Sequence, residues 1–377
     1  MKRSFNLIVL LGCLLFMPET PTRAQAKDVV VGVNLTNAPY DLSVAEQEAI
    51  LGAMQKAGVR VIRAAIPGEK ALPAGKGISF AERVYAHGIK ILWLMGIHYT
   101  GAWPGPPPKG FAGLWGAPRM TQSDAERFRG DFTWTLTKLE EKGIALAGIE
   151  LSNEINWAGF NADFPLPGQG RCFQLSDLTS DPEAQQVAKG LLLYMDSLAV
   201  MKEVRDHSNL NQHTPIITAG LADIDSPTHH HNWVKADCVG SDATLDFWRA
   251  HGLDKLVDGY GLHFYPSQKT AAERLAHLKQ NGLEQCQPPG SAKGKPCWIT
   301  EWGFNVVGDK CPVDDSARTP LVRELRGNLS QLAKQNRLGG LFYYNWVGNI
   351  RAPKEDPASA FRCGALTESG RLAIDPM

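Results

Sequence analysis

Eight short runs rich in aliphatic and β-branched residues recur along the chain, and longer stretches with the apolar spacing of amphipathic helices separate them. The runs cover residues 29–34, 59–65, 89–96, 145–152, 215–219, 257–263, 296–300 and 340–346. This alternation predicts βα units and a parallel sheet. Eight units in 377 residues predict a (β/α)8 TIM barrel, because that barrel takes about 250 residues plus insertions. We therefore expect a single α/β domain.

Several intervening stretches begin with residues that favour helix starts. Ser43 and Glu46 have the spacing of a capping box, and Asp181 precedes a proline that suits the first helical position. Asp124 precedes a long amphipathic run. Further helices are expected to begin near Ser241, Thr270 and Asp315.

The rival architecture is an open, doubly wound sheet. Such a sheet usually carries a glycine-rich phosphate loop, and the sequence has neither a G-x-G-x-x-G nor a Walker pattern. Two long segments, residues 101–118 and 156–179, follow the third and fourth runs. They are expected to be long βα loops on the face where barrel enzymes keep their active sites.

The first residues have the three parts of a secretory signal peptide. Two basic residues precede an apolar run over residues 7–17, and residues 24–26 have the small-x-small pattern of a cleavage site. We therefore expect a signal peptide over residues 1–26, a (β/α)8 domain over residues 27–377, and a secreted or periplasmic protein. Modification of Cys13 as a lipoprotein is the alternative.

The expected mature chain keeps six cysteines, an even number that predicts disulfides in an oxidising compartment. Six cysteines allow 15 connectivities. The organisation of the chain favours the pairs Cys172–Cys238, Cys286–Cys297 and Cys311–Cys363. No C-x-x-C pair is present, which argues against a zinc or redox site. Two triplets, at Asn34 and Asn328, match the glycosylation sequon.

The charge balance excludes several classes of partner. The chain has 39 Lys and Arg against 39 Asp and Glu, so its formal net charge is zero. It lacks the basic block that binding to nucleic acid or anionic lipid requires, so neither partner is expected. No later apolar run reaches the roughly eighteen residues of a membrane-spanning helix. Nothing marks an oligomer interface, which makes a monomer the expectation.

Two glutamates directly follow expected barrel strands. Asn153-Glu154 follows the fourth run, and Glu301 follows the seventh. Side chains at the carboxyl ends of barrel strands point into the mouth, so these carboxylates are expected to face one another. Glycoside hydrolysis needs such a pair, because one carboxyl group protonates the leaving oxygen while the other attacks the anomeric carbon or activates water.

The sequences IELSNE (149–154) and WITEWG (298–303) resemble the strand-four and strand-seven signatures of clan A glycoside hydrolases, and the chain most resembles family 5 of that clan. The resemblance implies a retaining β-glycosidase with Glu154 as acid/base and Glu301 as nucleophile. A sister family, such as family 39, is the alternative. Ile155 departs from the pattern, since the family often has proline there.

Further positions resemble the sugar site of family 5 in strand order. Arg63 resembles the arginine that supports the nucleophile, and Asn153 the asparagine that binds the sugar 2-hydroxyl. His263 and Tyr265 match the family's His-x-Tyr, whose tyrosine hydrogen-bonds the nucleophile. His98 resembles a histidine that lines the sugar site.

Aromatic residues cluster at the expected strand ends, where flat rings stack on sugars. Trp346 resembles the sugar-stacking tryptophan of the family, and Trp157 and Trp302 are expected to bind substrate as well. Many aromatics on long loops favour several subsites and an endo-acting enzyme on a β-linked polysaccharide such as a glucan, mannan or exopolysaccharide. Exo-action, transglycosylation and a carbohydrate-binding barrel without turnover are the alternatives.

A metal site is the remaining alternative chemistry. The three consecutive histidines at positions 229–231, with His98 and Glu150, invite a metallohydrolase hypothesis. Adjacent histidines do not project to one point on an ordinary loop, so we expect no metal. No cofactor motif is present either.

Overall fold

The computed structural model describes residues 28–68, 75–101, 117–224, 235–304, 311–347 and 358–377. The expected signal peptide, the cysteine at position 13 and the three consecutive histidines lie outside these residues. No helix in the described part of the chain is both long enough and apolar enough to cross a bilayer.

Eight parallel strands form one sheet, in the order β6-β4-β3-β2-β1-β10-β9-β8. They are β1 (Val30–Asn34), β2 (Val61–Ala65), β3 (Lys90–Met95), β4 (Gly148–Leu151), β6 (Ile216–Ile217), β8 (Tyr260–Phe264), β9 (Cys297–Trp302) and β10 (Leu338–Tyr343). Parallel bridges from Ile217 to Gly259 and from Leu221 to Leu262 join β6 to β8 and close the ring. The predicted (β/α)8 barrel is confirmed, and every predicted run overlaps one of its strands.

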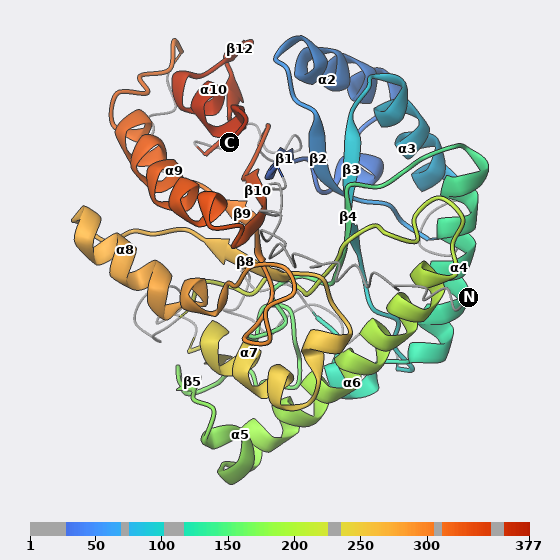
Figure 1. The fold of residues 1–377 in the computed structure, drawn as a ribbon, viewed down its shortest axis with the longest axis vertical. Helices are drawn as coiled ribbons and strands as arrows, with labels where there is room; N and C mark the ends of the chain where they lie inside the picture. Colours follow the sequence, from blue (N-terminus) through green and yellow to red (C-terminus); the bar gives the residue numbers. More distant parts are fainter. Residues whose placement is uncertain (1–27, 69–74, 102–116, 225–234, 305–310, 348–357) are drawn as a thin grey trace, which may run out of the picture.

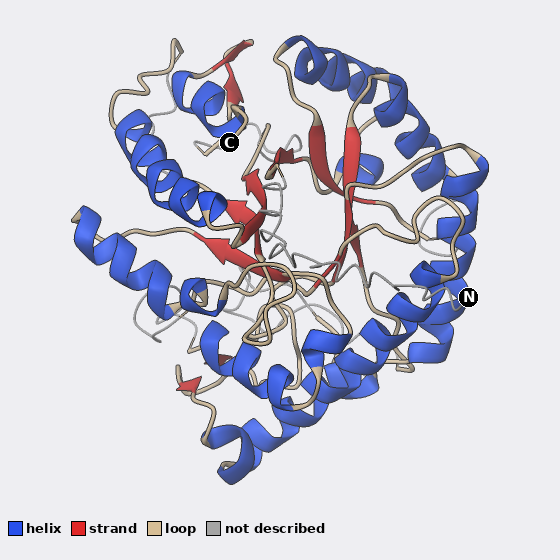
Figure 2. Cartoon of the chain, in the orientation of Figure 1, coloured by secondary structure: helices blue, strands red, loops and turns tan. Residues whose placement is uncertain are grey.

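Helices surround the sheet in chain order, as Figures 1 and 2 show. They are α1 (Ala38–Asp41), α2 (Val44–Lys56), α3 (Lys76–Ala86), α4 (Ala125–Glu141), α5 (Asp177–Ser180), α6 (Pro182–Asp206), α7 (Ser241–Ala250), α8 (Ala271–Gln280), α9 (Arg318–Lys334) and α10 (Glu368–Ile374). Three predicted start signals are observed: Ser43 and Glu46 form a capping box, Asp124 caps α4, and Asp181 accepts backbone N–H groups at the start of α6.

Short strand pairs and disulfides tie the loops together. The strands β5 (Cys172–Phe173) and β7 (Cys238–Val239) form a parallel pair outside the barrel, and β11 (Phe361–Arg362) and β12 (Ala365–Leu366) form an antiparallel pair. The disulfides are the three pairs that the sequence favoured: Cys172–Cys238, Cys286–Cys297 and Cys311–Cys363.

The barrel interior has an apolar layer near the amino ends of the strands. Its buried side chains form one cluster: Val61, Leu92, Ile217, Trp298 and Phe342. Two glycines, Gly340 on β10 and Gly259 just before β8, make room for the Trp298 ring. A Cβ on Gly340 would lie 2.3 Å from Trp298 Cε3, and one on Gly259 would lie 2.5 Å from Trp298 Cδ1. The indole therefore fills space that these two glycines leave empty.

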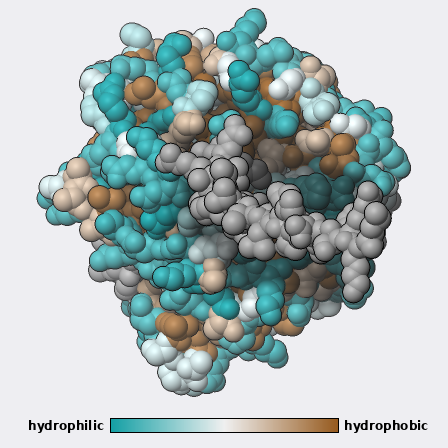
Figure 3. Space-filling view, in the orientation of Figure 1, coloured by the Kyte–Doolittle hydropathy of each residue, from teal (hydrophilic) through white to brown (hydrophobic). Residues whose placement is uncertain are grey.

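The outer surface differs from this interior. Hydrophilic residues predominate on the face shown in Figure 3, with apolar residues scattered among them. The buried residues of α3, α4 and α9 recur at helical spacing, so these helices pack their apolar sides inward.

We predict that Gly340→Ala lowers the free energy of unfolding by about 1–3 kcal/mol, because the added methyl overlaps Trp298. Gly327→Ala is the matched control: it lies in α9 with no heavy atom within 4 Å of the new Cβ, and it should raise stability by about 0.5–1 kcal/mol. Urea unfolding measures both. Equal stability of the two variants would contradict the packing described here.

Candidate active site

Polar side chains replace apolar ones in the half of the barrel interior toward the carboxyl ends of the strands. Side chains alternate along a strand, so Arg63 faces the interior as Val61 does, two residues earlier. Four further polar residues of this layer are fully buried: Asn34 on β1, Glu150 on β4, His263 on β8 and Thr300 on β9. Buried polar groups require partners, and this layer supplies them internally.

A β-bulge in β9 turns two consecutive polar side chains inward. Between its pairings at Ile299 and at Glu301, β9 has one residue more than its neighbour β8. The extra residue is Thr300, whose hydroxyl donates to Glu150 Oε1 at 2.8 Å. Strict alternation would turn Glu301 toward the outer helices, and the bulge returns it to the interior.

Arg63 lies at the centre of the polar layer and uses all five of its N–H donors. Nε donates to Glu150 Oε2 and Nη1 to Glu301 Oε1, both at 2.5 Å. The remaining donors reach Asn34 Oδ1 at 3.0 Å, Asn153 Oδ1 at 2.8 Å and Glu150 Oε1 at 3.2 Å. Burial disfavours the charged guanidinium, but the two carboxylates outweigh burial and raise the pKa of Arg63. Arg63 therefore stays charged.

Glu301 is held as a carboxylate at both oxygens. Oε1 accepts from Arg63, and Oε2 accepts from the Tyr265 hydroxyl at 2.6 Å. Burial raises the pKa of Glu301, but the charges of His263 and Arg63 and the Tyr265 hydrogen bond outweigh burial and lower it. Burial and the Glu301 charge raise the pKa of Tyr265, which keeps its hydroxyl protonated. The expected contacts of Arg63 and Tyr265 with Glu301 are therefore observed.

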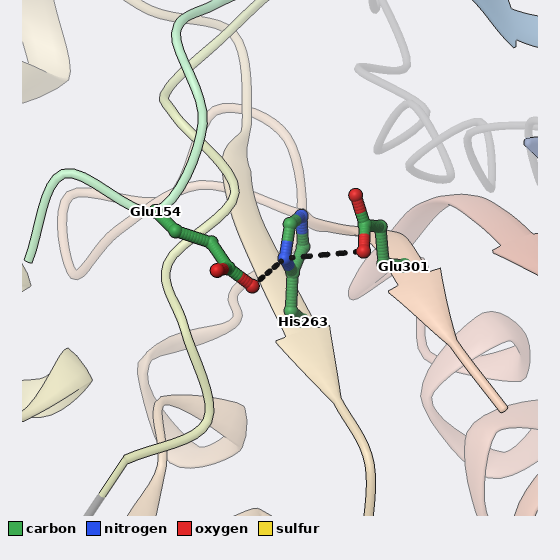
Figure 4. A group of neighbouring side chains, drawn as sticks. All are labelled: Glu154, His263 and Glu301. Atoms are coloured by element: carbon green, nitrogen blue, oxygen red, sulfur yellow. Dashed lines mark hydrogen bonds and ion pairs between the residues drawn. The ribbon is translucent and has the colours of Figure 1, made fainter. Parts of the chain in front are cut away.

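His263 lies between the two carboxylates (Figure 4). Its Nδ1 is 2.7 Å from Glu154 Oε1 and 3.7 Å from Glu301 Oε2. Burial lowers the pKa of this imidazole, but the two carboxylates outweigh burial and raise it. A Cβ on Gly220 would lie 2.1 Å from His263 Nε2, so the ring occupies this place only because residue 220 has no side chain.

The chain at the end of β4 adopts an unusual conformation that carries Glu154. Ser152 and Glu154 both have positive φ, at 69° and 47°, which costs about 1–2 kcal/mol for a residue with a Cβ. Backbone hydrogen bonds from Ser152 to Met95 at 2.7 Å and from Glu154 to Gly220 at 2.9 Å hold this turn. The Trp157 indole donates to Glu154 Oε2 at 3.1 Å, so both oxygens of Glu154 have partners.

The two glutamates are close enough to act on one bond. One oxygen of Glu154, one oxygen of Glu301 and a ring nitrogen of His263 all lie within 4.8 Å of one another. Carboxyl groups about 5–5.5 Å apart are typical of retaining glycosidases, and inverting enzymes need about 6.5–9.5 Å. The separation therefore fits direct attack by one carboxylate.

The same three atoms have the spacing of a metal site, but their charges disfavour a cation. The Arg63 guanidinium already contacts Glu301, and the two carboxylates raise the pKa of His263, which disfavours the neutral imidazole that a metal ligand needs. The Arg63 guanidinium therefore already supplies positive charge where a metal ion would lie.

Comparison with solved structures finds the same fold in several glycosidases. A fungal β-1,4-galactanase is 17% identical, with a TM-score of 0.54 over 91% of this chain and 93% of the galactanase. A β-glucosidase from Thermotoga maritima in complex with cyclophellitol is 14% identical, with a TM-score of 0.51 over 92% and 96%. A monomeric β-xylosidase from Caulobacter crescentus CB15 is 13% identical, with a TM-score of 0.57 over 92% and 67%.

These identities are low, so the similarity establishes the fold alone. Comparisons with protein-family models and with curated protein sequences find no match.

The prediction that Trp302 and Trp346 stack on a sugar is wrong, because both side chains are fully buried. Trp302 follows Glu301 by one residue and therefore faces the outer helices, where its ring meets Tyr343 edge-on at 5.1 Å. Trp346 stacks on Phe361 at 5.1 Å. Apolar rings buried in this way stabilise the fold and offer no face to a ligand.

The other predicted substrate-binding residues differ in their placement. Asn153 lies in the polar layer, and its Oδ1 accepts from Arg63, which leaves its amide N–H groups for other partners. Trp157 is 5% exposed, so it supports Glu154 and has little area for stacking. His98 lies beyond β3 with Nε2 at 3.0 Å from Asp131 on α4.

Several residues of the site were not identified from the sequence. Tyr344, directly after β10, is partly exposed and meets the Tyr265 ring edge-on at 6.1 Å. Asp223 accepts the Tyr265 backbone N–H at 3.1 Å and pairs with His277 of α8 at 2.5 Å. The position of Tyr344 directly after an expected strand could have identified it as a residue of the site. No sequence pattern distinguishes Asp223 from an ordinary loop aspartate.

We predict that Arg63→Met lowers the free energy of unfolding by about 3–5 kcal/mol, because it leaves two carboxylates buried without their cation. Arg129→Met removes a guanidinium of the same size from surface pairs with Glu126 and Glu203 and should change stability little. Urea unfolding compares the two. Equal losses would contradict the central role of Arg63.

The pKa shifts of Glu301 and His263 predict a particular pH dependence of stability. The lowered pKa of Glu301 stabilises the fold above its ordinary value of 4.5, and this contribution is lost as pH falls through the folded-state pKa. The raised pKa of His263 stabilises the fold below 6.5, and this contribution is lost as pH rises through the folded-state pKa. Glu301→Gln removes the first contribution and weakens the second.

The unfolding free energy of Glu301→Gln should therefore vary less than that of the parent below pH 4.5 and above pH 6.5. Urea unfolding at several pH values measures this difference. Glu82→Gln, on the outer helix α3, should keep the dependence of the parent. Identical profiles for parent and Glu301→Gln would show that the pKa shifts are absent.

Proposed function

We propose that this protein is a retaining β-glycosidase that cleaves a β-linked polysaccharide by double displacement. The observation that carries the proposal is the pair of carboxyl groups with oxygens within 4.8 Å, each held by a different set of donors. Different surroundings give two carboxyl groups different roles, which is what glycoside hydrolysis requires.

Glu301 is the proposed nucleophile. Its charge is stabilised by Arg63 and Tyr265, and its pKa is lowered, so it is ionised when substrate binds. The carboxylate attacks the anomeric carbon and forms an ester while the glycosidic C–O bond breaks. Glu154 gives its proton to the leaving oxygen, which departs as an alcohol.

Water completes the reaction in the second displacement. Glu154, now a carboxylate, takes a proton from a water molecule whose oxygen attacks the anomeric carbon. The ester bond breaks, Glu301 is restored as a carboxylate, and Glu154 again holds a proton. A sugar hydroxyl in place of water would give transglycosylation with the same residues.

Position supports the assignment of the acid to Glu154. Three glutamates, Glu150, Glu154 and Glu301, lie in this polar site, and Arg63 pairs with Glu150 and Glu301. The Glu154 side chain is the most exposed of the three, at 17% against 11% for Glu301 and none for Glu150. It is therefore best placed to exchange its proton with water.

The proposal also covers the substrate, the family, the cellular location and the oligomeric state. An endo-acting enzyme on a glucan, mannan or exopolysaccharide is supported by the aromatic-rich loops of the sequence, and family 5 of clan A by the residues around the two glutamates. Export to the cell exterior or periplasm fits the three disulfides. The mature domain acts as a monomer, without metal or organic cofactor.

The test is a screen for release of reducing ends from β-glucans, mannans, xylans and bacterial exopolysaccharides. The parent and the control Glu82→Gln should release sugar from one class, at equal rates, and Glu301→Gln should release none. Glu154→Ala should lose about 10²–10⁴-fold on the natural polysaccharide but much less on an aryl glycoside with an activated leaving group.

Two outcomes would overturn these assignments. Glu154→Ala with parental activity on the polysaccharide removes the acid role. Sugar binding without release by either parent or Glu301→Gln indicates a carbohydrate-binding barrel that has no turnover.

A further inference from the structure

One disulfide joins the loop that follows β4 to the loop that follows β6. Cys172 lies in β5 and Cys238 in β7, and the two cysteines are paired in the small parallel sheet. These loops leave the barrel just after Glu154 and Gly220, which are themselves joined by a backbone hydrogen bond. The disulfide is therefore a second link between these loops, farther from the barrel than the hydrogen bond between Glu154 and Gly220.

The strand β7 also pairs with the residues that follow Glu154. Trp157 and Cys238 form an antiparallel bridge, so the same cysteine contacts both β5 and the Glu154 loop. The Val239 N–H donates to the Asn156 carbonyl at 2.7 Å on one side of the bridge, and a second backbone bond of 3.1 Å flanks the other. Three chain segments thus meet at Cys238.

The side chain of Asn156 fixes this junction from within. It is fully buried, and its amide N–H groups reach the carbonyls of Val239 at 3.0 Å and Ala222 at 3.2 Å. Its Oδ1 accepts the Ala222 N–H at 2.9 Å. Every bond of this amide therefore joins the Glu154 loop to the loop after β6.

A buried carboxylate anchors the other strand of the pair. Asp237 Oδ1 accepts the backbone N–H groups of Gln169 at 2.9 Å and Arg171 at 2.8 Å, just before Cys172. Asp237 Oδ2 lies 3.2 Å from the Arg171 guanidinium. We call β5, β7 and the Cys172–Cys238 disulfide the clamp. Asn156 holds the clamp at β7, and Asp237 holds it at the residues before β5.

We propose that this clamp positions the acid/base glutamate. The clamp holds the backbone at Trp157, the Trp157 indole holds Glu154 Oε2, and Glu154 sits on a turn whose positive φ values need outside support. Cys172, Cys238 and Trp157 are thus positioning residues for Glu154. The inference rests on the proposed function for the role of Glu154, but the mechanical link can be tested without activity.

The test compares two disulfide deletions of similar loop length. C172A/C238A opens a link across 66 residues, and the control C311A/C363A opens one across 52 residues. Because loop entropy changes slowly with length, both variants should lose similar stability through the unfolded chain. If the two variants differ only in the hydrogen exchange or the kinetics that report on Glu154, that difference is a local effect of the clamp.

Hydrogen exchange of the folded proteins gives the readout that needs no substrate. In C172A/C238A, the amides of residues 154–160 should exchange at least about tenfold faster than in the parent, and in C311A/C363A at the parental rate. Equal exchange of this segment in both variants overturns the proposal. If the parent has no glycosidase activity, the proposed function is contradicted. The exchange comparison still tests whether the clamp holds the segment that carries Glu154.

Kinetics test the consequence for the acid. With phenyl and dinitrophenyl β-glycosides of the sugar that the screen identifies, C172A/C238A should lose about tenfold to a hundredfold in kcat/KM on the phenyl substrate and less than about twofold on the dinitrophenyl one. The control C311A/C363A should treat both substrates as the parent does. Faster exchange with unchanged leaving-group dependence overturns the positioning role.

A second variant covers failure of C172A/C238A to fold. Trp157→Phe keeps the disulfide and removes only the N–H that holds Glu154, so it should show the same selective loss on the phenyl substrate. Trp134→Phe on the outer helix α4 is its matched control and should behave as the parent. Parental behaviour of Trp157→Phe overturns the proposal.

Discussion

A single buried guanidinium connects the fold of this protein to its chemistry. Arg63 on β2 binds side chains from β1, β4, the β4 loop and β9, so one cation joins strands on both sides of the barrel. A buried charge is costly unless every donor has an acceptor, and here every donor has one. The position of Glu301 therefore depends on the correct packing of these strands around the carboxyl-terminal half of the barrel interior.

Much of the fold was predictable because it depends on local patterns. Alternating strands and helices, Ser43 with Glu46, and Asp181 before a proline each carry their structure in adjacent residues. The two glutamates were predictable for a related reason, since strand ends in a barrel point to one mouth. Chain order along the predicted strands was likewise enough to favour the three disulfide pairs.

The parts that the sequence did not reveal depend on register between strands. An extra residue in β9 decides that Thr300 and Glu301 both face inward and that Trp302 faces outward. Glu150 on β4 is needed because it pairs with Arg63, and Gly220 is needed because His263 occupies the space beside it. Both partners lie far away in sequence. Single-sequence patterns do not specify such pairings, and the two buried tryptophans were misassigned for that reason.

The environment of Asn34 limits where sugar can be attached to the protein itself. This asparagine begins one of the two sequons, and its amide nitrogen lies 2.9 Å from the Thr300 carbonyl and 3.3 Å from that of Tyr343. Its Oδ1 accepts from Arg63, and the side chain is fully buried. A glycan on that nitrogen would keep β1 from closing against β9 and β10. In any host that glycosylates exported proteins, modification of Asn34 and completion of the barrel therefore exclude one another, whereas the second sequon, at Asn328, lies on the outer helix α9.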